Sequence, residues 1–349
     1  MTQPLTIIRP RCLERGKTTR LDRVLQANLV RYPVEQVIET MPQLQHLEGK
    51  RLLFAINLGA SGVNLSYYAM LKKIRTTPHL FQDCLAGVVV DGESELYTKS
   101  VSRELVFAAN QAGCAFVGKP LVEATGSLKN FHILAQINNT DELSAYTNSV
   151  GELLERLTAP LLPPAPEGEL LVLHASSHPT SNTMALWDMV RSALTPRPIT
   201  ELSLRNGEIA DCSGCPYTVC LHFGEKGGCF YGGPMTQEVY PAVRRCVSLL
   251  MLCPNYNDAL SANLTAFINR LTALFRQMRF FDKRLYALVV SGYSGSDIVA
   301  EQLIAALNMN KTFFLPPHFC MTETANNAGS ILHIPGIQER ARAFAQSLV

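Results

Sequence analysis

Short apolar runs alternate with amphipathic segments through the second half of the chain. The runs have the length and apolar content of buried strands, and the segments between them repeat apolar residues at helical spacing. In the longest such segment, Leu264, Phe267, Ile268, Leu271 and Phe275 fall on one helical face. The expected strands are 170–175, 199–204, 248–253, 285–290 and 312–315, and the expected helices are 184–194, 239–246, 262–278 and 299–307. This alternation predicts an α/β fold with a doubly wound, parallel, five-stranded sheet that binds ligands at the carboxyl ends of its strands.

A proline-rich segment divides the chain. Residues 159–168 hold four prolines and a glycine, which continue neither a helix nor a central strand. We therefore expect an N-terminal extension at 1–48, a smaller α/β domain at 49–158, a linker at 159–168 and a C-terminal domain at 169–349.

The smaller domain has its own strand signals, Leu52–Leu58 and Leu85–Val90. Leu52–Leu58 corresponds in position to the expected strand at 170–175, and Leu85–Val90 to the expected strand at 248–253. The stretch between the two strands is shorter in the first half. The first domain is therefore either a reduced repeat that lacks the second strand or an unrelated α/β domain, and the pattern leaves both open.

Composition excludes several classes of protein. The chain has 349 residues, which suits two domains, and 47% hydrophobic against 17% charged residues argues against disorder. The net charge of +2 provides no general attraction to nucleic acid or to an anionic membrane, and no apolar run is long enough to span a bilayer. The first residues lack the apolar core of a secretory signal. We expect a cytoplasmic protein with neither nucleic acid nor membrane as a partner.

Polar loops follow three of the expected strands. The first, Ser176–Thr183, brings hydroxyls and backbone N–H groups to a helix N-terminus, where a phosphate dianion binds readily; taken alone, it is better explained as a helix cap. The second begins at Pro254 and carries Tyr256, whose aromatic face suits a flat ring. The third, Ser291–Asp297, has two glycines that permit close backbone approach. Three such loops on one sheet indicate a binding site more strongly than any one of them.

The loops resemble those of the NADPH-dependent FMN reductase family, and more narrowly those of the iron–sulfur flavoproteins within the flavodoxin-like superfamily. The resemblance rests on Ala175-Ser-Ser-His178 with Ser181-Asn-Thr183, on Pro254-Asn-Tyr256 with Ser261-Ala262, and on Asn269-Arg270 at a helix end. It covers about half of the chain and implies a flavodoxin-like domain that binds FMN. The residues it places around the phosphate are Ser176, His178, Ser181, Asn182 and Thr183, and those around the ribityl chain and ring are Pro254, Asn255, Tyr256, Asn257, Ser291, Gly292, Tyr293 and Gly295.

One position departs from the family pattern. His178 stands where the family has arginine, so a permanent charge and a bidentate phosphate donor are replaced by a titratable ring. In the first domain, Tyr97–Ser100 and Lys119–Gly126 are expected as loops matching the flavin loops, and we expect this domain to be a degenerate flavodoxin-like domain rather than a second flavin site.

Four of the ten cysteines lie within eighteen residues, at Cys212, Cys215, Cys220 and Cys229. Four thiolates suit a [4Fe–4S] cluster or tetrahedral zinc, and no metal is the remaining alternative, since spacing alone does not select the metal. The resemblance favours the cluster, because the spacing from Cys229 to Met235 follows the family pattern while the inner gaps are longer.

The sequence therefore predicts an FMN-dependent oxidoreductase whose flavin performs the chemistry. Its expected partners are flavin with NAD(P)H or a redox protein, and a homo-oligomer is left open. Alternatives are an FMN electron carrier without a substrate of its own and a scaffold whose loops have lost FMN. No residue is singled out as an acid or base.

Overall fold

The computed structural model describes residues 3–14, 19–160, 168–176, 180–205 and 209–348. The chain divides into two compact units, one formed by Met1–Leu161 with Pro316–His318 and the other by Leu162–Leu315 with Phe319–Val349. The predicted linker at 159–168 spans this division. None of the described helices has both the length and the apolar character needed to cross a membrane.

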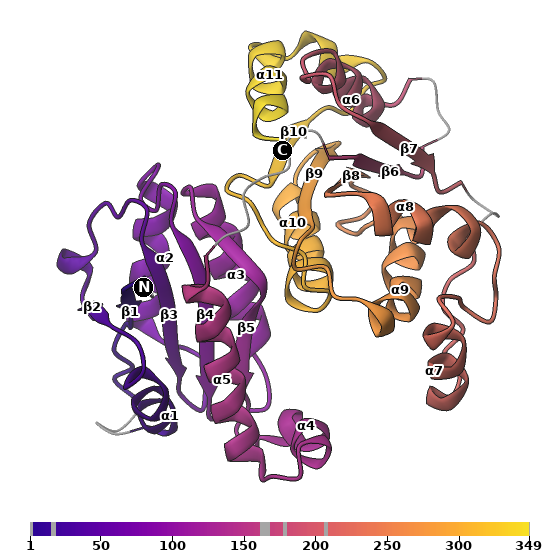
Figure 1. Ribbon diagram of the computed structural model, residues 1–349. Coiled ribbons are helices and arrows are strands. Elements are labelled where there is room, and N and C mark those ends of the chain that lie inside the picture. The colour runs from indigo at the N-terminus through magenta and orange to yellow at the C-terminus, as the bar shows by residue number, and fades with distance from the viewer. Residues whose placement is uncertain (1–2, 15–18, 161–167, 177–179, 206–208, 349) are drawn as a thin grey trace. The chain divides into compact units, whose positions relative to one another are not determined.

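The first unit is a parallel five-stranded sheet with helices on its faces (Figure 1). Its strand order is β2-β1-β3-β4-β5, and every pairing is parallel. The strands are β1 (Leu5–Ile8), β2 (Val34–Ile38), β3 (Arg51–Leu58), β4 (Leu85–Gly92) and β5 (Ala115–Ala124). The helices are α1 (Arg20–Leu29), α2 (Leu65–Thr76), α3 (Thr98–Gln111), α4 (His132–Ile137) and α5 (Glu142–Thr158), with short 3-10 turns at Met41–Gln43 and Lys129–Phe131.

Three expectations for this unit need correction. Residues 1–48 are not an extension, because β1, α1 and β2 belong to the first fold unit, and the unit is complete rather than reduced. The sequence signal was weak because β1 has only four residues and four of the five β2 residues are exposed, as suits an edge strand. Both expected loops are mostly regular structure: β5 continues to Ala124 within Lys119–Gly126, and α3 begins at Thr98 within Tyr97–Ser100.

The second unit has the predicted doubly wound sheet. Its order is β10-β9-β8-β6-β7, again with parallel pairing throughout. The strands are β6 (Leu170–His174), β7 (Ile199–Ser203), β8 (Ser248–Pro254), β9 (Arg284–Ser291) and β10 (Cys320–Thr324). The helices are α6 (Asn182–Ser192), α7 (Tyr217–Glu225), α8 (Tyr240–Arg245), α9 (Ala262–Gln277), α10 (Ser296–Leu303) and α11 (Ile337–Ser347), with π-helical turns at Met235–Val239 and Ile304–Met309 and a 3-10 turn at Ser330–His333.

The last strand was placed too early. Residues 312–315 form only an isolated bridge, between Phe314 and Arg284, whereas the paired strand is β10. The edge pairing with β9 is interrupted by Pro316–His318 and resumes at Phe319, whose carbonyl accepts from Ala287. Two consecutive prolines lack the N–H groups that a continuous strand would use, so the apolar pattern located only the first part of this edge.

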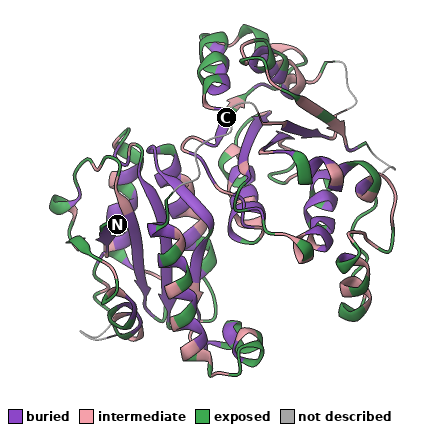
Figure 2. Cartoon of the chain, viewed as in Figure 1, coloured by how far each residue is buried: buried purple, intermediate pink, exposed green. Residues whose placement is uncertain are grey.

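Counted in chain order, the strands of both units follow the flavodoxin-like order 2-1-3-4-5. In the second unit, α6 and α11 cover one face of the sheet, and α8, α9 and α10 cover the other (Figure 1). The central strands are the most completely buried elements, while the edge strands β2 and β7 and the outer helix faces are more exposed (Figure 2). Trp187 lies in the core between α6 and the sheet with no exposed surface.

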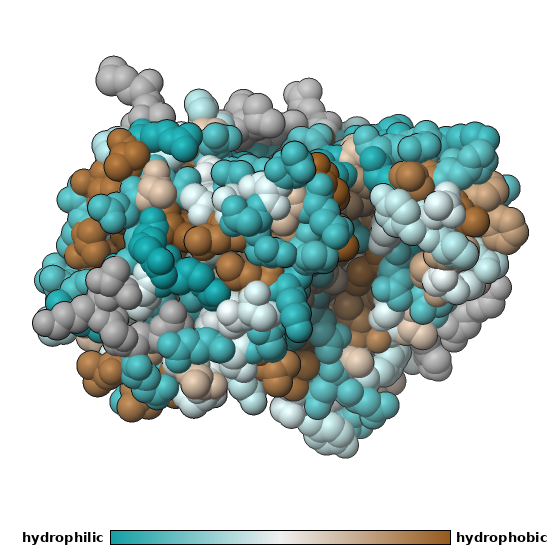
Figure 3. All heavy atoms as spheres, turned by 90° about the horizontal axis from the view of Figure 1, so that it is seen from below, coloured by the Kyte–Doolittle hydropathy of each residue, from teal (hydrophilic) through white to brown (hydrophobic). Residues whose placement is uncertain are grey.

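On the face shown in Figure 3, the exposed apolar side chains do not gather into one surface. Figure 3 shows them as separate brown groups among teal polar residues on one face. Isolated examples such as Leu13 and Val30 are 86% and 79% exposed. Scattered apolar residues of this kind are common on globular proteins and do not by themselves indicate a partner.

The carboxyl edge of the first sheet contains a buried ion pair. Asp91, at the end of β4, has no exposed surface, and both its oxygens accept from Arg20, at 2.9 and 3.1 Å. Arg20 also donates to the carbonyls of Gly92, Thr125 and Gly126. The guanidinium is thereby fixed at the start of α1 against the ends of β4 and β5.

Replacing Asp91 with asparagine should lower the free energy of unfolding by about 3 kcal/mol, because Arg20 is left with an uncompensated and largely buried charge. Urea denaturation measures the change. Glu35→Gln is the matched control: Glu35 pairs with Lys50 on the surface, and losing that pair should cost less than about 1 kcal/mol. Equal losses in the two variants would contradict the structural role of the buried pair.

Candidate functional site

The predicted loops lie beside one another. They follow β6, β8 and β9, which are consecutive in the sheet, and all three strands point their carboxyl ends the same way. The parallel register brings Leu173 opposite Met251 and Pro254 opposite Val290. Residues far apart in sequence therefore meet at one edge of the second sheet, which is where this fold binds ligands.

The first loop leads into α6. Ser181 is the N-cap, and its hydroxyl accepts from the backbone N–H of Met184 at 3.3 Å, so the capping function expected for this segment is present. The hydroxyl proton of Ser181 is still able to donate. Ser176 is half-buried, whereas Thr183 is only 3% exposed and packs inward. His178 lies outside the described residues.

Asn182 has a different environment from the one expected. Its side-chain amide donates to the carbonyls of Ala325, at 3.0 Å, and Asn327, at 2.9 Å. Its side-chain oxygen accepts from the backbone N–H of Ile331 at 3.4 Å. The side chain therefore joins the start of α6 to the segment that follows β10.

The second loop is a tight turn. Tyr256 and Ala259 exchange backbone hydrogen bonds, and the two residues between them, Asn257 and Asp258, have φ of 54° and 57°. Two positive φ angles at the central positions describe a type I′ turn, for which Asn and Asp are favoured. The turn follows Pro254 at the end of β8 and leaves the Tyr256 ring 61% exposed.

Asn255 fastens the second loop to the third. Its amide lies 3.0 Å from the hydroxyl of Ser291, 2.9 Å from the carbonyl of Ser294 and 3.2 Å from a carboxylate oxygen of Asp258. The side-chain oxygen of Asn255 is buried and has no partner among the described residues.

The third loop depends on one glycine. Gly295 has φ of +84°, and a Cβ at this position would lie 2.0 Å from the carboxylate of Asp258. A side chain would therefore separate the second and third loops. Ser291 is fully buried and shares a 2.7 Å hydrogen bond with the Ser296 hydroxyl, so its side chain supports the loop rather than facing the edge. Tyr293, by contrast, is 80% exposed.

A fourth loop, Ala325–Ser330, was missed by the sequence reasoning because the last strand was placed too early. Asn326 donates to the hydroxyl of Tyr293 at 3.2 Å, and a Cβ on Gly292 would meet the side-chain oxygen of Asn326 at 3.2 Å. The run Asn326-Asn327-Ala-Gly329 directly after a strand resembles the other polar loops and was the available signal.

His174 ends β6 immediately before the first loop and is 8% exposed. Its Nε2 lies 3.5 Å from Glu201 on β7, and the other oxygen of Glu201 accepts from the indole of Trp187 at 2.9 Å. Burial lowers the pKa of His174, and the positive charge of Arg205 acts the same way, while Glu201 opposes both.

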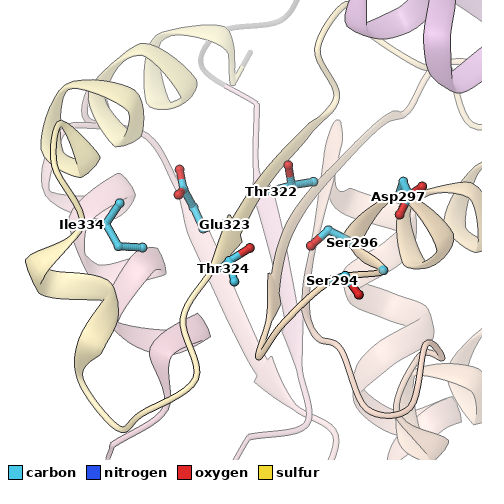
Figure 4. A pocket seen from close by; sticks show the side chains of 8 residues that line it. Ser294, Ser296, Asp297, Thr322, Glu323, Thr324 and Ile334 are labelled. Atoms are coloured by element: carbon cyan, nitrogen blue, oxygen red, sulfur yellow. The ribbon is translucent and has the colours of Figure 1, made fainter.

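An open hollow of about 470 Å³ lies beside the edge strand β10 (Figure 4). It reaches the third loop at Ser294 and Gly295, but no residue of the first or second loop lines it. It therefore borders the site without forming its centre. The lining residues are Ser294, Gly295, Ser296, Asp297, Thr322, Glu323, Thr324 and Ile334.

Of the four clustered cysteines, Cys220 lies in α7, and the other three lie in the segments on either side of this helix. Cys212 is exposed, Cys215, Cys220 and Cys229 are partly buried, and all ten cysteines of the chain are free thiols. Within the described part of the chain, which contains all four, no group of three or more potential metal ligands is arranged to hold an ion. As placed here, these side chains do not fit a cluster or a zinc ion.

The corresponding edge of the first sheet is occupied by its own side chains. A Cβ on Gly62 would lie 2.2 Å from the ring of Tyr97, and one on Gly59 would lie 2.0 Å from the carboxylate of Glu14. The Arg20–Asp91 pair lies at the ends of the neighbouring strands.

In a comparison with known proteins, one family model matches a large part of the second unit. Residues 169–327 match the family model described as NADPH-dependent FMN reductase, from β6 into the fourth loop. The predicted resemblance of the C-terminal half is therefore confirmed, and this family consists of flavin-dependent oxidoreductases. No curated protein matches the chain.

Similar solved structures include an NAD(P)H:quinone oxidoreductase from Methanothermobacter marburgensis, with 13% identity, 52% of this chain and 95% of that chain covered, and a TM-score of 0.40. An azoreductase from Bacillus anthracis has 15% identity, covers 52% of this chain and 100% of its own, and has a TM-score of 0.38.

His174 should make the protein sensitive to acid. Because its pKa is lower in the folded state, the unfolded chain binds a proton more readily, and stability is lost as pH falls below the ordinary imidazole value of about 6.5. When the pH falls from about 8 to about 5, the free energy of unfolding should decrease less in His174→Gln than in the unsubstituted protein. Denaturant titrations at each pH measure this. His333→Gln, at an exposed position, is the control and should retain the original dependence; an unchanged dependence in His174→Gln would contradict the assignment.

Proposed function

We propose that the second unit binds FMN at the carboxyl edge of its sheet and that the protein is an FMN-dependent oxidoreductase supplied with electrons by a reduced pyridine nucleotide. The observation that carries the proposal is the convergence of the polar loops after β6, β8 and β9, within the region that matches the reductase family. We assign no flavin site to the first unit, which lies outside the region that matches the reductase family.

The residues at this edge fit a flavin nucleotide. Ser176, the hydroxyl of Ser181 and the N-terminal amides of α6 provide donors for a phosphate dianion, which the helix dipole also favours. His178, predicted as a further donor, would lie on the same loop. The buried, unpartnered oxygen of Asn255 is an acceptor for a ribityl hydroxyl or a ring N–H.

The two exposed tyrosines provide aromatic faces for a planar ring. Tyr256 follows β8 and Tyr293 follows β9, so they flank the position where the loops meet. Pro254 and Asn257 shape the turn that presents Tyr256, and Gly292 and Gly295 allow the backbone of the third loop to approach closely.

When bound, FMN supplies the transfer of a hydride or of electrons. The residues of this chain bind the phosphate, orient the ring and reduce access of water to it. Their hydrogen-bonding groups near the ring set its redox potential. A carrier without its own substrate would use the same groups, so turnover distinguishes the two functions.

Titration with FMN should quench flavin fluorescence with a dissociation constant at or below tens of micromolar, which corresponds to roughly 6 kcal/mol of binding free energy. The FMN-loaded protein should then oxidise NADPH or NADH with an artificial electron acceptor. Absence of quenching would overturn the proposed flavin site. Binding without turnover would favour the carrier.

We also propose, separately, that Cys212, Cys215, Cys220 and Cys229 hold an iron–sulfur cluster. The proposal is supported by the spacing of the four cysteines and by the resemblance of this region to the iron–sulfur flavoproteins. The side-chain arrangement described above does not support it. No electron-transfer step is assigned to this loop.

Protein prepared without oxygen should contain about four irons per chain if the cluster is present. Replacing any of the four cysteines with serine should then remove the visible absorbance not due to flavin, while Cys246→Ser, at a buried cysteine elsewhere, should retain it. Stoichiometric zinc without iron would indicate a structural site instead. Protein free of both metals would refute the proposal.

A further inference from the structure

The segment Ala325–Ile331 spans the distance between the first and third loops of the site. Its first residue is tied to β9, since the N–H of Ala325 donates to the carbonyl of Ser291 at 2.9 Å. Two carbonyls of the segment accept hydrogen bonds from the side-chain amide of Asn182, at the start of α6, and the N–H of Ile331 donates to the side-chain oxygen of Asn182. Asn326, between these contacts, reaches Tyr293. A single short segment thus connects the phosphate end of the site to its aromatic wall.

The hydrogen-bonding capacity of Asn182 is already committed. A side-chain amide has two N–H donors, and in Asn182 they face the carbonyls of Ala325 and Asn327. The oxygen accepts from Ile331 and, as an acceptor, cannot favour a phosphate dianion. No side-chain donor of Asn182 remains for the phosphate, although the residue stands in the loop where a phosphate ligand is expected.

Asn326, in the same segment, contacts the exposed side chain of Tyr293. Tyr293 is 80% exposed, so packing alone does not fix its orientation. The 3.2 Å hydrogen bond from Asn326 to its hydroxyl is the contact that restrains it, and Gly292 leaves room for Asn326 to approach. Displacing the segment would release the ring.

We propose that Asn182 is a positioning residue that holds Ala325–Ile331 in place and, through Asn326, sets Tyr293 against the flavin ring. The inference rests on the proposed function for the identity of the ligand, but the Asn182 contacts exist without it. Because Tyr293 acts on the ring, which FMN and riboflavin share, loss of Asn182 should weaken both ligands alike. Loss of a phosphate ligand would weaken FMN alone.

The test compares Asn182→Ala with Ser176→Ala in titrations with FMN and with riboflavin. Asn182→Ala should weaken both by a similar factor, about tenfold, as expected when several hydrogen bonds are lost together. Ser176→Ala should weaken FMN by about tenfold and leave riboflavin nearly unchanged. Asn310→Ala, an exposed asparagine of the same unit, is the matched control and should change neither.

Two further measurements report on the segment itself. Hydrogen exchange of 325–331 should accelerate in ligand-free Asn182→Ala and stay unchanged in Asn310→Ala. Tyr293→Phe, which keeps the ring but loses the hydroxyl, should alter the visible circular dichroism of bound flavin as Asn182→Ala does. The double variant that combines Asn182→Ala with Tyr293→Phe should lose less binding free energy than the sum of the losses in the two single variants.

A loss in Asn182→Ala confined to FMN would overturn the proposal and restore Asn182 as a phosphate ligand. Unchanged exchange in 325–331 would also overturn it, whatever the affinities. If the unsubstituted protein binds neither flavin, the proposed function fails, while the exchange result still decides whether Asn182 holds the segment.

Discussion

Parallel pairing of β6, β8 and β9 is the constraint on which the proposed site depends. Because the strands run in the same direction and in fixed register, the residues that follow them emerge at one edge of the sheet. Asn255 then joins the second loop to the third, and Asn182 joins the helix after the first loop to the fourth. The backbone topology brings the loops together, and two asparagine side chains fix their separation.

The two units show how little the strand order alone decides about function. Both sheets have the same order, yet their carboxyl edges differ chemically. In the first unit Arg20 and Asp91 neutralise one another and Tyr97 packs against Gly62. In the second, Tyr256 and Tyr293 are exposed. A buried asparagine oxygen without a partner among the described residues occurs in both units, at Asn57 and at Asn255.

Most of the expected elements of the second unit agree closely with the structure because they carry a strong local signal. The strand at 248–253 is fully buried apart from its end, and the helix at 262–278 has a continuous apolar face. The failures share a cause. β2 is an exposed edge strand, and β10 follows an interruption by two prolines, so neither presents the apolar pattern of a central strand.

The sequence by itself determined the α/β class, the division near residue 160 and the identity of the loops that meet at the second sheet's edge, because apolar periodicity and turn residues are local properties. Only the tertiary structure decided what each polar side chain does there. Asn182, Ser291 and Asn255 are similar polar residues in similar loops, and all three hold neighbouring segments together. Of the three, Asn255 also keeps a buried acceptor without a partner among the described residues. Those roles depend on atoms contributed by residues up to about 150 positions away, and a local pattern contains no information about partners at that separation.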